Sequence, residues 1–339
     1  MIAPGPRPTT REVAALARVS VATVSYVLNG KDGRVGEETR QRVLAAAEEL
    51  GYVRSSSARS LRLRRTERVC LVVGSIGVPA YDQLARDLYT AADQAGYGVM
   101  TIVVDSPARA DKAVDLLRQH VADGAVIAPS VPHLTDAQLR ALTGSRLPLV
   151  VMSNAVAPDG FDVVRTSEAG ACAEALDHLV ATGRRRIAYL GHEFELTGRQ
   201  PSERRDAYLD AHDRHGLPRA PELTVAGADD RVTAYRAVGA LLTRPSPPDA
   251  IFAASDRAAI SAILALRDAG VAVPDEVAVV GVGNLEEGRI TRPALTTVGP
   301  PVMDFHDVVR LLFDRVLAEE PPPFRVLTTP WSFVRRGSA

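Results

Sequence analysis

The stretch TTREVAALARVSVATVSYVLNG, residues 9–30, predicts two short helices joined by a tight corner. Apolar residues at helical spacing indicate a first helix over Thr10–Ala17. Residues 18–20 are too few for anything except a turn. Ser20 is a favourable N-cap for a second helix over Val21–Leu28, because its hydroxyl can accept a bond from a free helical N–H.

A third helix is expected over Glu37–Leu50, after a loop at residues 29–33. Acidic residues occupy its first turn and Gly51 follows its last, as is typical of helix ends. We therefore assign residues 1–53 to a small unit of three helices.

The second helix has two chemically different faces. We expect its inward side chains to be Val24, Val27 and Leu28. Its outward side chains would be Val21, Ala22, Ser25 and Tyr26.

Residues 54–68 change in character, being basic, rich in serine and poor in apolar residues. Such a segment cannot hold a core, and it is interpreted as a linker that folds only against a partner. Residues 1–68 carry 13 Lys and Arg against 7 Asp and Glu, while the rest of the chain carries 27 against 34. A basic start on an acidic remainder suggests a polyanionic partner for the first part, and a solvated, arginine-rich start is the alternative.

From Val69 onward, short apolar strands alternate with helices. Examples of the strands are VCLVVG (69–74), GAVIA (124–128), DAIFAAS (249–255) and VAVVGVG (277–283). This alternation predicts parallel sheets covered on both faces. The strands are too numerous for one open sheet of ordinary width, so the fold class is α/β with two lobes.

The chain closes with a helix expected over Asp304–Ala318 and a strand over Val326–Val334. Within the body, residues 69–339, the N-lobe is expected at about 69–164 and 293–324. The C-lobe is expected at about 165–292 and 325–339.

The N-terminus lacks an apolar segment of the secretory kind, and no apolar run approaches the ~20 residues of a membrane span. Cys70 and Cys172 lie in apolar stretches without paired spacing, which favours buried, reduced thiols. The protein is expected in the cytoplasm, away from membranes.

Further motifs follow the opening stretch in order: VGEETRQRVLAAAEELGY (35–52), GRRRIAYLG (183–191), PDAIFAASDRAAISAILALRDAG (248–270) and VPDEVAVVGVGN (273–284). From Thr9 to Ser338 the chain closely resembles the lactose/galactose repressor (LacI/GalR) family. The resemblance implies a helix-turn-helix head, a hinge and a two-lobed body like that of periplasmic binding proteins. It also implies a nucleoid-associated transcriptional repressor that binds a near-palindromic double-stranded DNA operator as a homodimer.

In the head, the resemblance implies base contacts by Val21, Ala22 and Tyr26. It implies phosphate contacts by Thr10, Thr23, Ser25 and Asn29. Apolar side chains at the reading positions favour thymine methyl groups over guanine. The alternative is that Val21 and Ala22 are plain helix surface.

Two head residues depart from the family's pattern. Tyr26 stands where a basic residue is frequent. Arg18 replaces the usual glycine of the turn, which would cost up to ~1 kcal/mol if that position has a positive φ, although the arginine could reach a phosphate.

The linker resembles the family's hinge helix, which enters the minor groove. By resemblance, Leu61 is the wedge between base steps, Ala58 allows close packing and Arg62 is a groove-side cation. Arg54 and Ser55 replace a Pro-Asn pair common at the start of that helix. A plain flexible linker is the alternative.

In the body, the family binds a small effector between the lobes. By resemblance, Arg204 is the arginine that reaches the effector. Ser255 and Asp256 end a predicted strand, where pockets form, and Ser75 and Tyr81 lie in the first strand-to-helix loop, so these four are also expected to contact the effector. Two alternatives stay open, namely that Arg204 forms a structural salt bridge and that Asp256 is a helix N-cap.

Three polar positions of the family are lost, since they hold Thr166, Gly283 and Pro300 here. A site that keeps a guanidinium but loses a carboxylate favours an anionic effector over an ordinary sugar. A degenerate site with constitutive repression and a neutral ligand are the alternatives.

Catalysis is not expected. The histidines show no metal-ligand spacing, and neither a nucleophile elbow nor a phosphate-binding loop is present. Neither a metal nor an organic cofactor is therefore predicted. A solute-binding receptor of similar fold is the remaining alternative, and the attached head argues against it.

Overall fold

The computed structural model describes residues 8–28, 35–52, 65–129, 131, 133–198 and 201–339. The chain divides into two compact units, a head (Met1–Thr66) and a body (Glu67–Ala339). Among the described residues, no helix is long and apolar enough to cross a membrane.

The head consists of α1 (Thr10–Leu16), α2 (Val21–Leu28) and α3 (Glu37–Glu49), which confirms the three predicted helices to within one residue. Their core is built on side chains without exposed surface, namely Val13, Val24 and Val43. The predicted N-cap is also confirmed, because Thr23 N donates to Ser20 Oγ at 3.0 Å.

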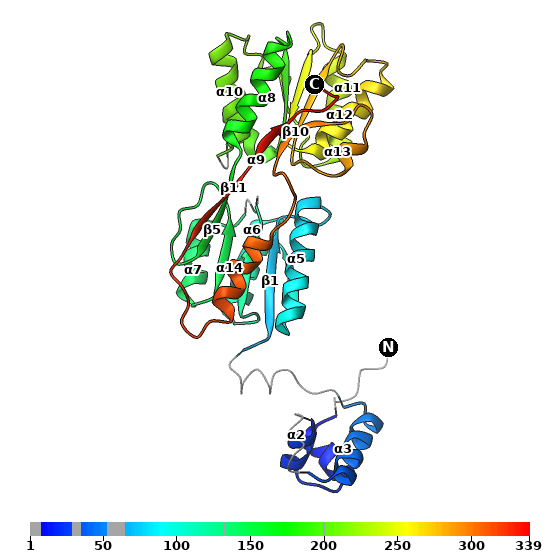
Figure 1. Ribbon diagram of the computed structural model, residues 1–339, viewed down its shortest axis with the longest axis vertical. Helices are drawn as coiled ribbons and strands as arrows, with labels where there is room; N and C mark the ends of the chain where they lie inside the picture. The colour runs from blue at the N-terminus through cyan, green and yellow to red at the C-terminus, as the bar shows by residue number, and fades with distance from the viewer. Residues whose placement is uncertain (1–7, 29–34, 53–64, 130, 132, 199–200) are drawn as a thin grey trace. The chain divides into compact units, whose positions relative to one another are not determined.

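The body has two sheets of six strands each, one in each lobe (Figure 1). The N-lobe sheet is parallel throughout. Its strands, in spatial order, are β11 (Val326–Pro330), β5 (Asp162–Ser167), β4 (Leu149–Met152), β3 (Gly124–Ile127), β1 (Arg68–Val73) and β2 (Gly98–Val103).

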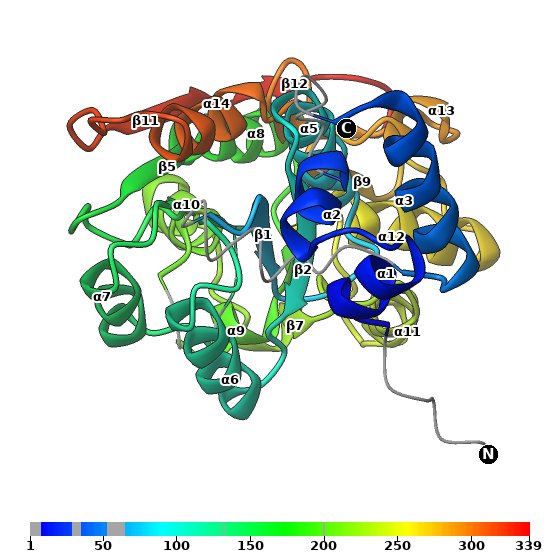
Figure 2. The ribbon, with the colours of Figure 1, turned by 90° about the horizontal axis from the view of Figure 1, so that it is seen from below.

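Helices cover both faces of this sheet, as the apolar strands predict. One face carries α5 (Pro79–Ala95) and α14 (His306–Val316), and the other carries α6 (Pro107–Arg118) and α7 (Asp136–Gly144) (Figure 2). Neighbouring residues of β1 enter different cores: Leu71 packs on the first face and Cys70 on the second.

The strands of the C-lobe sheet are connected in the same spatial arrangement as those of the N-lobe sheet. The difference is the edge strand β12, which pairs antiparallel with β10. Its strands are β12 (Ser332–Val334), β10 (Thr296–Gly299), β9 (Ala278–Val282), β8 (Ala250–Ala253), β6 (Ile187–Gly191) and β7 (Thr224–Ala226). Its helices are α8 (Ala169–Ala181), α9 (Glu193–Leu196), α10 (Glu203–His215), the short 3₁₀ helix η2 (Pro221–Leu223), α11 (Arg231–Leu242), α12 (Asp256–Asp268) and α13 (Glu287–Ile290).

The chain crosses between lobes three times, after β5, after β10 and after β11. Two predicted lobe boundaries are therefore wrong. Residues 293–299 were expected in the N-lobe, yet β10 belongs to the C-lobe sheet. Residues 325–330 were expected in the C-lobe, yet β11 pairs with β5 in the N-lobe.

The final predicted strand is also two strands in different sheets, separated by Trp331. The reason is that a strand's sequence records its apolar spacing but not its partner, and these partners lie far away in the chain. A run that is continuous in sequence can leave one sheet and join another.

Candidate nucleic-acid interface and candidate effector site

The outward face of α2 is as predicted. Val21 and Tyr26 are 46% and 38% exposed, and Ala22 and Ser25 are exposed too. Val24 and Val27 point into the head's core. The three predicted base-reading side chains thus lie on one accessible face, and α2 is anchored to the core by its other face.

The predicted phosphate-contacting residues differ in exposure and in hydrogen bonding. Ser25 is exposed, while Thr23 is half-buried with its hydroxyl 2.8 Å from Ser20 Oγ. Thr10 begins α1, and its hydroxyl lies 2.8 Å from Tyr52 Oη. Asn29 lies outside the described residues, as do the predicted hinge residues Ala58, Leu61 and Arg62.

The carboxyl ends of the two sheets face one another, because the crossovers leave β5, β10 and β11 at those ends. In each sheet the strand order also reverses there, with β1 between β2 and β3, and β6 between β7 and β8. Ligands of doubly wound sheets bind where the order reverses. This region is the candidate effector site.

Tyr81, on α5, is one wall of the site. Its hydroxyl donates to the Pro129 carbonyl oxygen at 2.5 Å, which fixes the ring beside the end of β3. Burial raises the pKa of Tyr81 to about 12, the positive charge of Arg204 opposes the rise and Asp229 adds to it. The phenol therefore keeps its proton, and its pKa depends on charges in the opposite lobe.

Arg204, on α10, is held by the protein on three sides. Its Nε and Nη2 donate to the two carboxylate oxygens of Glu168 at 3.1 and 2.8 Å. Its Nη1 donates to the Ala254 carbonyl oxygen at 2.5 Å, and the guanidinium lies 5.6 Å from the centre of the Trp331 ring.

Burial alone would lower the pKa of Arg204, but the charge and hydrogen bonds of Glu168 raise it, so the group stays charged. The ion-pair alternative is what the structure shows. Two of the five guanidinium N–H groups, one on each Nη, have no partner in these three contacts.

Asp256 lies close enough to Arg204 for that positive charge to act on it, but none of its surface is open to a ligand. Its oxygens accept from Thr297 Oγ1 at 2.5 Å and from Leu285 N at 2.7 Å. A Cβ on Gly281 would lie 2.3 Å from Asp256 Oδ1, so glycine is required for this approach. Burial raises the pKa of Asp256 to about 6 against the effect of these hydrogen bonds. The prediction of an effector contact here is corrected to a structural role.

Ser255, and not Asp256, is the N-cap of α12. Its Oγ accepts from Ala258 N at 3.2 Å and donates to the Ala228 carbonyl oxygen at 3.0 Å. Ser75, directly after Gly74 at the end of β1, is exposed. The structure thus leaves Ser75 accessible and gives Ser255 two bonds within the protein.

The three departures from the family's pattern have local explanations. Thr166 bonds Asn154 through its amide and hydroxyl, and the Pro300 carbonyl oxygen accepts from Asn284 Nδ2 at 2.8 Å. Gly283 has a φ of 138°, a conformation that side chains rarely adopt. An aspartate at position 283 would be strained with this backbone.

Sequence reasoning missed four residues here. They are Glu168, His192, Asp229 and Trp331. His192 directly follows β6, and its Nδ1 lies 2.6 Å from Asp229 Oδ1, beyond the end of β7. Burial opposes ionisation of Asp229, but the hydrogen bond and charge of His192 lower its pKa. A search for polar residues just beyond strand ends would have found this pair.

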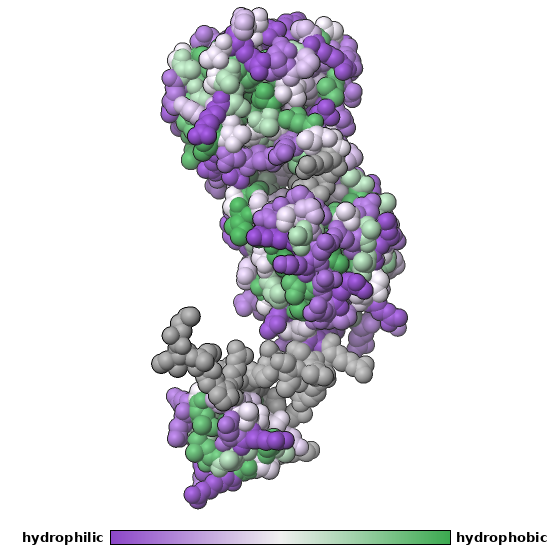
Figure 3. All heavy atoms as spheres, turned by 180° about the vertical axis from the view of Figure 1, so that it is seen from behind, coloured by the Kyte–Doolittle hydropathy of each residue, from purple (hydrophilic) through white to green (hydrophobic). Residues whose placement is uncertain are grey.

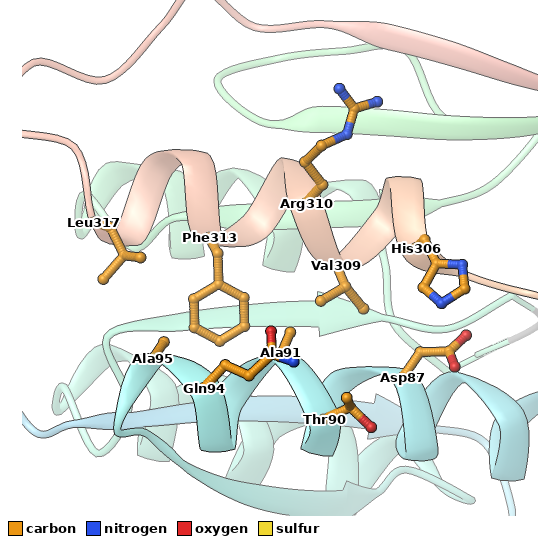
Figure 4. A pocket seen from close by; sticks show the side chains of 10 residues that line it. All are labelled: Asp87, Thr90, Ala91, Gln94, Ala95, His306, Val309, Arg310, Phe313 and Leu317. Atoms are coloured by element: carbon orange, nitrogen blue, oxygen red, sulfur yellow. The ribbon is translucent and has the colours of Figure 1, made fainter.

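A separate groove of about 550 Å³ runs between α5 and α14 (Figure 4). Its apolar floor includes Ala91, Val309 and Phe313, and Asp87 at one end accepts a bond from Phe305 N at 2.7 Å. None of the predicted effector residues lines it, so the groove is distinct from the candidate effector site.

Comparisons with known proteins agree with this architecture. Residues 9–55 match the model of bacterial regulatory proteins of the lacI family, and residues 176–339 match that of a periplasmic binding protein-like domain. The chain is 31% identical to the HTH-type transcriptional regulator CelR of Thermobifida fusca, over 97% of this chain and 98% of that protein. It is 30% identical to the HTH-type transcriptional regulator DegA of Bacillus subtilis, over 87% of each.

Solved structures give the same result. A transcriptional regulator CelR–cellobiose complex aligns with a TM-score of 0.67 at 29% identity, over 98% of this chain and 100% of that one. The lac repressor dimer bound to operator aligns with a TM-score of 0.71 at 24% identity, which is a likeness of fold. The relatives are regulators of transcription and not enzymes. The chain therefore belongs to the lacI family of bacterial regulatory proteins and is a helix-turn-helix transcriptional regulator.

Proposed function

We propose that the protein is a repressor that binds a near-palindromic operator as a homodimer. The exposed part of α2, which includes Val21, Ala22 and Tyr26, is the observation that carries this proposal. A helix of this kind fits the major groove, and its outward side chains meet base edges. Relatives include the ribose operon repressor of Escherichia coli and HTH-type transcriptional repressors named PurR. A protein with this role works at the nucleoid, in the cytoplasm.

Exposed apolar side chains of the body support dimer formation. Tyr89 on α5, Val232 and Tyr235 on α11, and Leu264 on α12 are each at least 39% exposed. On the face drawn in Figure 3, hydrophobic residues lie in small groups among hydrophilic ones. We propose that a second copy covers these four side chains on α5, α11 and α12, because burying apolar surface is the main gain of association.

We further propose that residues 54–68 form the hinge, with Leu61 as the minor-groove wedge beside Ala58 and Arg62. The support is the basic and sparsely apolar composition of this segment. An apolar side chain driven between base steps kinks the duplex at a cost of a few kcal/mol, which closer contact then offsets.

For the effector we propose a neutral, hydroxyl-rich molecule that touches Ser75, Tyr81, Ser255 and the free N–H groups of Arg204. The expectation of an anionic ligand required an unpaired guanidinium. Glu168 already neutralises Arg204, and Asp229 adds a further negative charge nearby. An added anion would therefore meet no net positive charge, whereas hydroxyls can use both donors and acceptors. CelR was solved with cellobiose.

The same contacts suggest how a ligand at the site could influence the crossovers between the two lobes. Glu168 lies in the first crossover and Trp331 in the third, and Arg204 touches both. A ligand that shifts Arg204 would disturb both crossovers and thereby change lobe closure, which is coupling in the two-state sense.

The rival proposal is a degenerate site with constitutive repression. The burial of Asp256 and the occupied hydroxyl of Ser255 favour it. A thermal-shift screen separates the two, because a ligand at ~100 times its Kd stabilises by about 2.7 kcal/mol. Neutral polyols should raise Tm and their phosphorylated or carboxylated derivatives should not. The reverse result would support the anionic ligand. An unchanged Tm with every compound of a broad panel would favour the degenerate site.

DNA binding is tested separately by selecting genomic fragments on the purified protein. Enrichment of a near-palindromic sequence is the expected outcome. Binding of small molecules without any retained DNA would instead indicate a solute receptor and overturn the proposal.

A further inference from the structure

Arg18 has an unusual backbone conformation for an arginine. Its φ is 54°, in the left-handed region, at the end of α1. Arg18 N donates to the Ala15 carbonyl oxygen and Val19 N to that of Ala14, at 3.3 and 3.0 Å. This is the bonding pattern of a helix C-terminus that normally carries glycine at the left-handed position.

The stability of the head does not explain an arginine here. Any Cβ in the left-handed region is strained relative to glycine, so Arg18 weakens the turn that it occupies. Its side chain is exposed. Within the described part of the chain, no carboxylate or other group is paired with its guanidinium. The next residue, Val19, packs against the head's core.

We propose that Arg18 binds a backbone phosphate of the operator beside the base edges read by α2. The inference rests on the proposed function. Arg18 is exposed and lies three positions before Val21, the first residue of the reading helix, so this long, unpaired cation can reach the polyanion when the helix docks. Phosphate contacts fix the register in which base-reading side chains meet their bases. The arginine thus improves DNA binding at the expense of the stability of the turn.

The proposal makes opposite predictions for stability and for binding. In the full-length protein, Arg18→Gly should weaken operator affinity by roughly 3- to 10-fold at low salt. The slope of log K against log salt should become shallower by about 0.9 for each head, as expected for one lost phosphate contact. Hydrogen-exchange protection of the α1–α2 amides should instead increase, by up to about fivefold, because the strain is removed.

Two variants serve as controls. Arg18→Lys keeps the charge and the strained backbone, so its affinity should stay within about threefold of wild type with an unchanged slope. Arg146, in the body, is also exposed and has a φ of 61°. Arg146→Gly removes an arginine from the same conformation far from the recognition helix in sequence, and should leave operator binding unaltered.

The outcomes are distinguishable. Unchanged affinity and slope in Arg18→Gly would overturn the proposal, even if the head becomes more stable. Lost discrimination at one base pair with an unchanged salt slope would show a base contact and would also overturn it. If the wild-type protein retains no operator DNA, the proposed function itself fails, and this inference with it.

Discussion

Arg204 and Glu168 form a bidentate ion pair at the first crossover between the lobes, with N–O distances of 3.1 and 2.8 Å. The Glu168 side chain is 9% exposed and that of Arg204 is 21% exposed. The pair joins α10 to the segment that leaves β5. It therefore belongs to the connection between the lobes as much as to the effector site.

Arg204→Ala should destabilise the body by roughly 2–4 kcal/mol, because it leaves a nearly buried carboxylate without its partner. Adding Glu168→Ala should recover part of that loss, since the orphaned charge is then gone. Calorimetric melting of the two single variants and the double variant measures the coupling. Strictly additive losses would mean that the two residues act independently.

Asp256 should make stability depend on pH in a window set by its shifted pKa. The pKa of about 6 in the folded protein lies above the ordinary aspartate pKa of 3.8, which applies when the chain is unfolded. The stability contributed by protonated Asp256 is therefore fully present below about pH 3.8 and is lost as the pH rises through 6. Relative to Asp256→Asn, the wild type should lose about 2–3 kcal/mol between pH 4 and pH 7.

The asparagine is a matched control, because its oxygen can accept from Leu285 N while its amide donates to Thr297 Oγ1. Melting temperatures of both proteins across this range are the measurement. Parallel pH profiles would show that Asp256 titrates as an ordinary carboxyl.

Operator binding should depend steeply on salt. Residues 1–68 have a formal charge of +6 and include the predicted phosphate contacts Thr10, Thr23, Ser25 and Asn29. If the two heads of a dimer together neutralise six or more phosphates, affinity should fall by about 10³-fold or more between 50 and 200 mM salt. Fluorescence anisotropy with a labelled operator gives the slope, and a flat dependence would rule out phosphate-dominated binding.

Leu61→Ala should reduce specific affinity and DNA bending while leaving the fold and the dimer intact, because only the proposed wedge is lost. Energy transfer between dyes at the operator ends reports the bend. Leu63→Ala removes a similar side chain from the same segment and should bend DNA like the wild type. Equal bending by the Leu61 variant would make residues 54–68 an ordinary linker.

The head was predictable almost completely from sequence. Its helices depend on local signals, such as the apolar spacing that buries Val24 and the Ser20 hydroxyl that caps α2. Arg18 was noted as a departure, but its positive φ became evident only from the hydrogen bonds that close the turn.

The candidate effector site was predicted less well. Tyr81 and Arg204 do lie near one another, but Asp256 is buried and the main partner of Arg204, Glu168, was missed. A carboxylate's exposure depends on what packs around it, here the close approach of Gly281 and the donors Leu285 and Thr297. No local pattern in the sequence contains that information.

The sequence by itself determined the three-helix head, the alternation of strands and helices, the presence of two α/β lobes and the family. Only the tertiary structure decided that β10 and β11 belong to opposite lobes from those expected, that Trp331 separates two strands and that Glu168 neutralises Arg204. The physical reason is how far apart in the sequence the interacting residues lie. Helix caps and apolar periodicity are settled within a few residues, whereas strand pairing and the charge of a site depend on groups far apart in the chain that only the folded protein brings together.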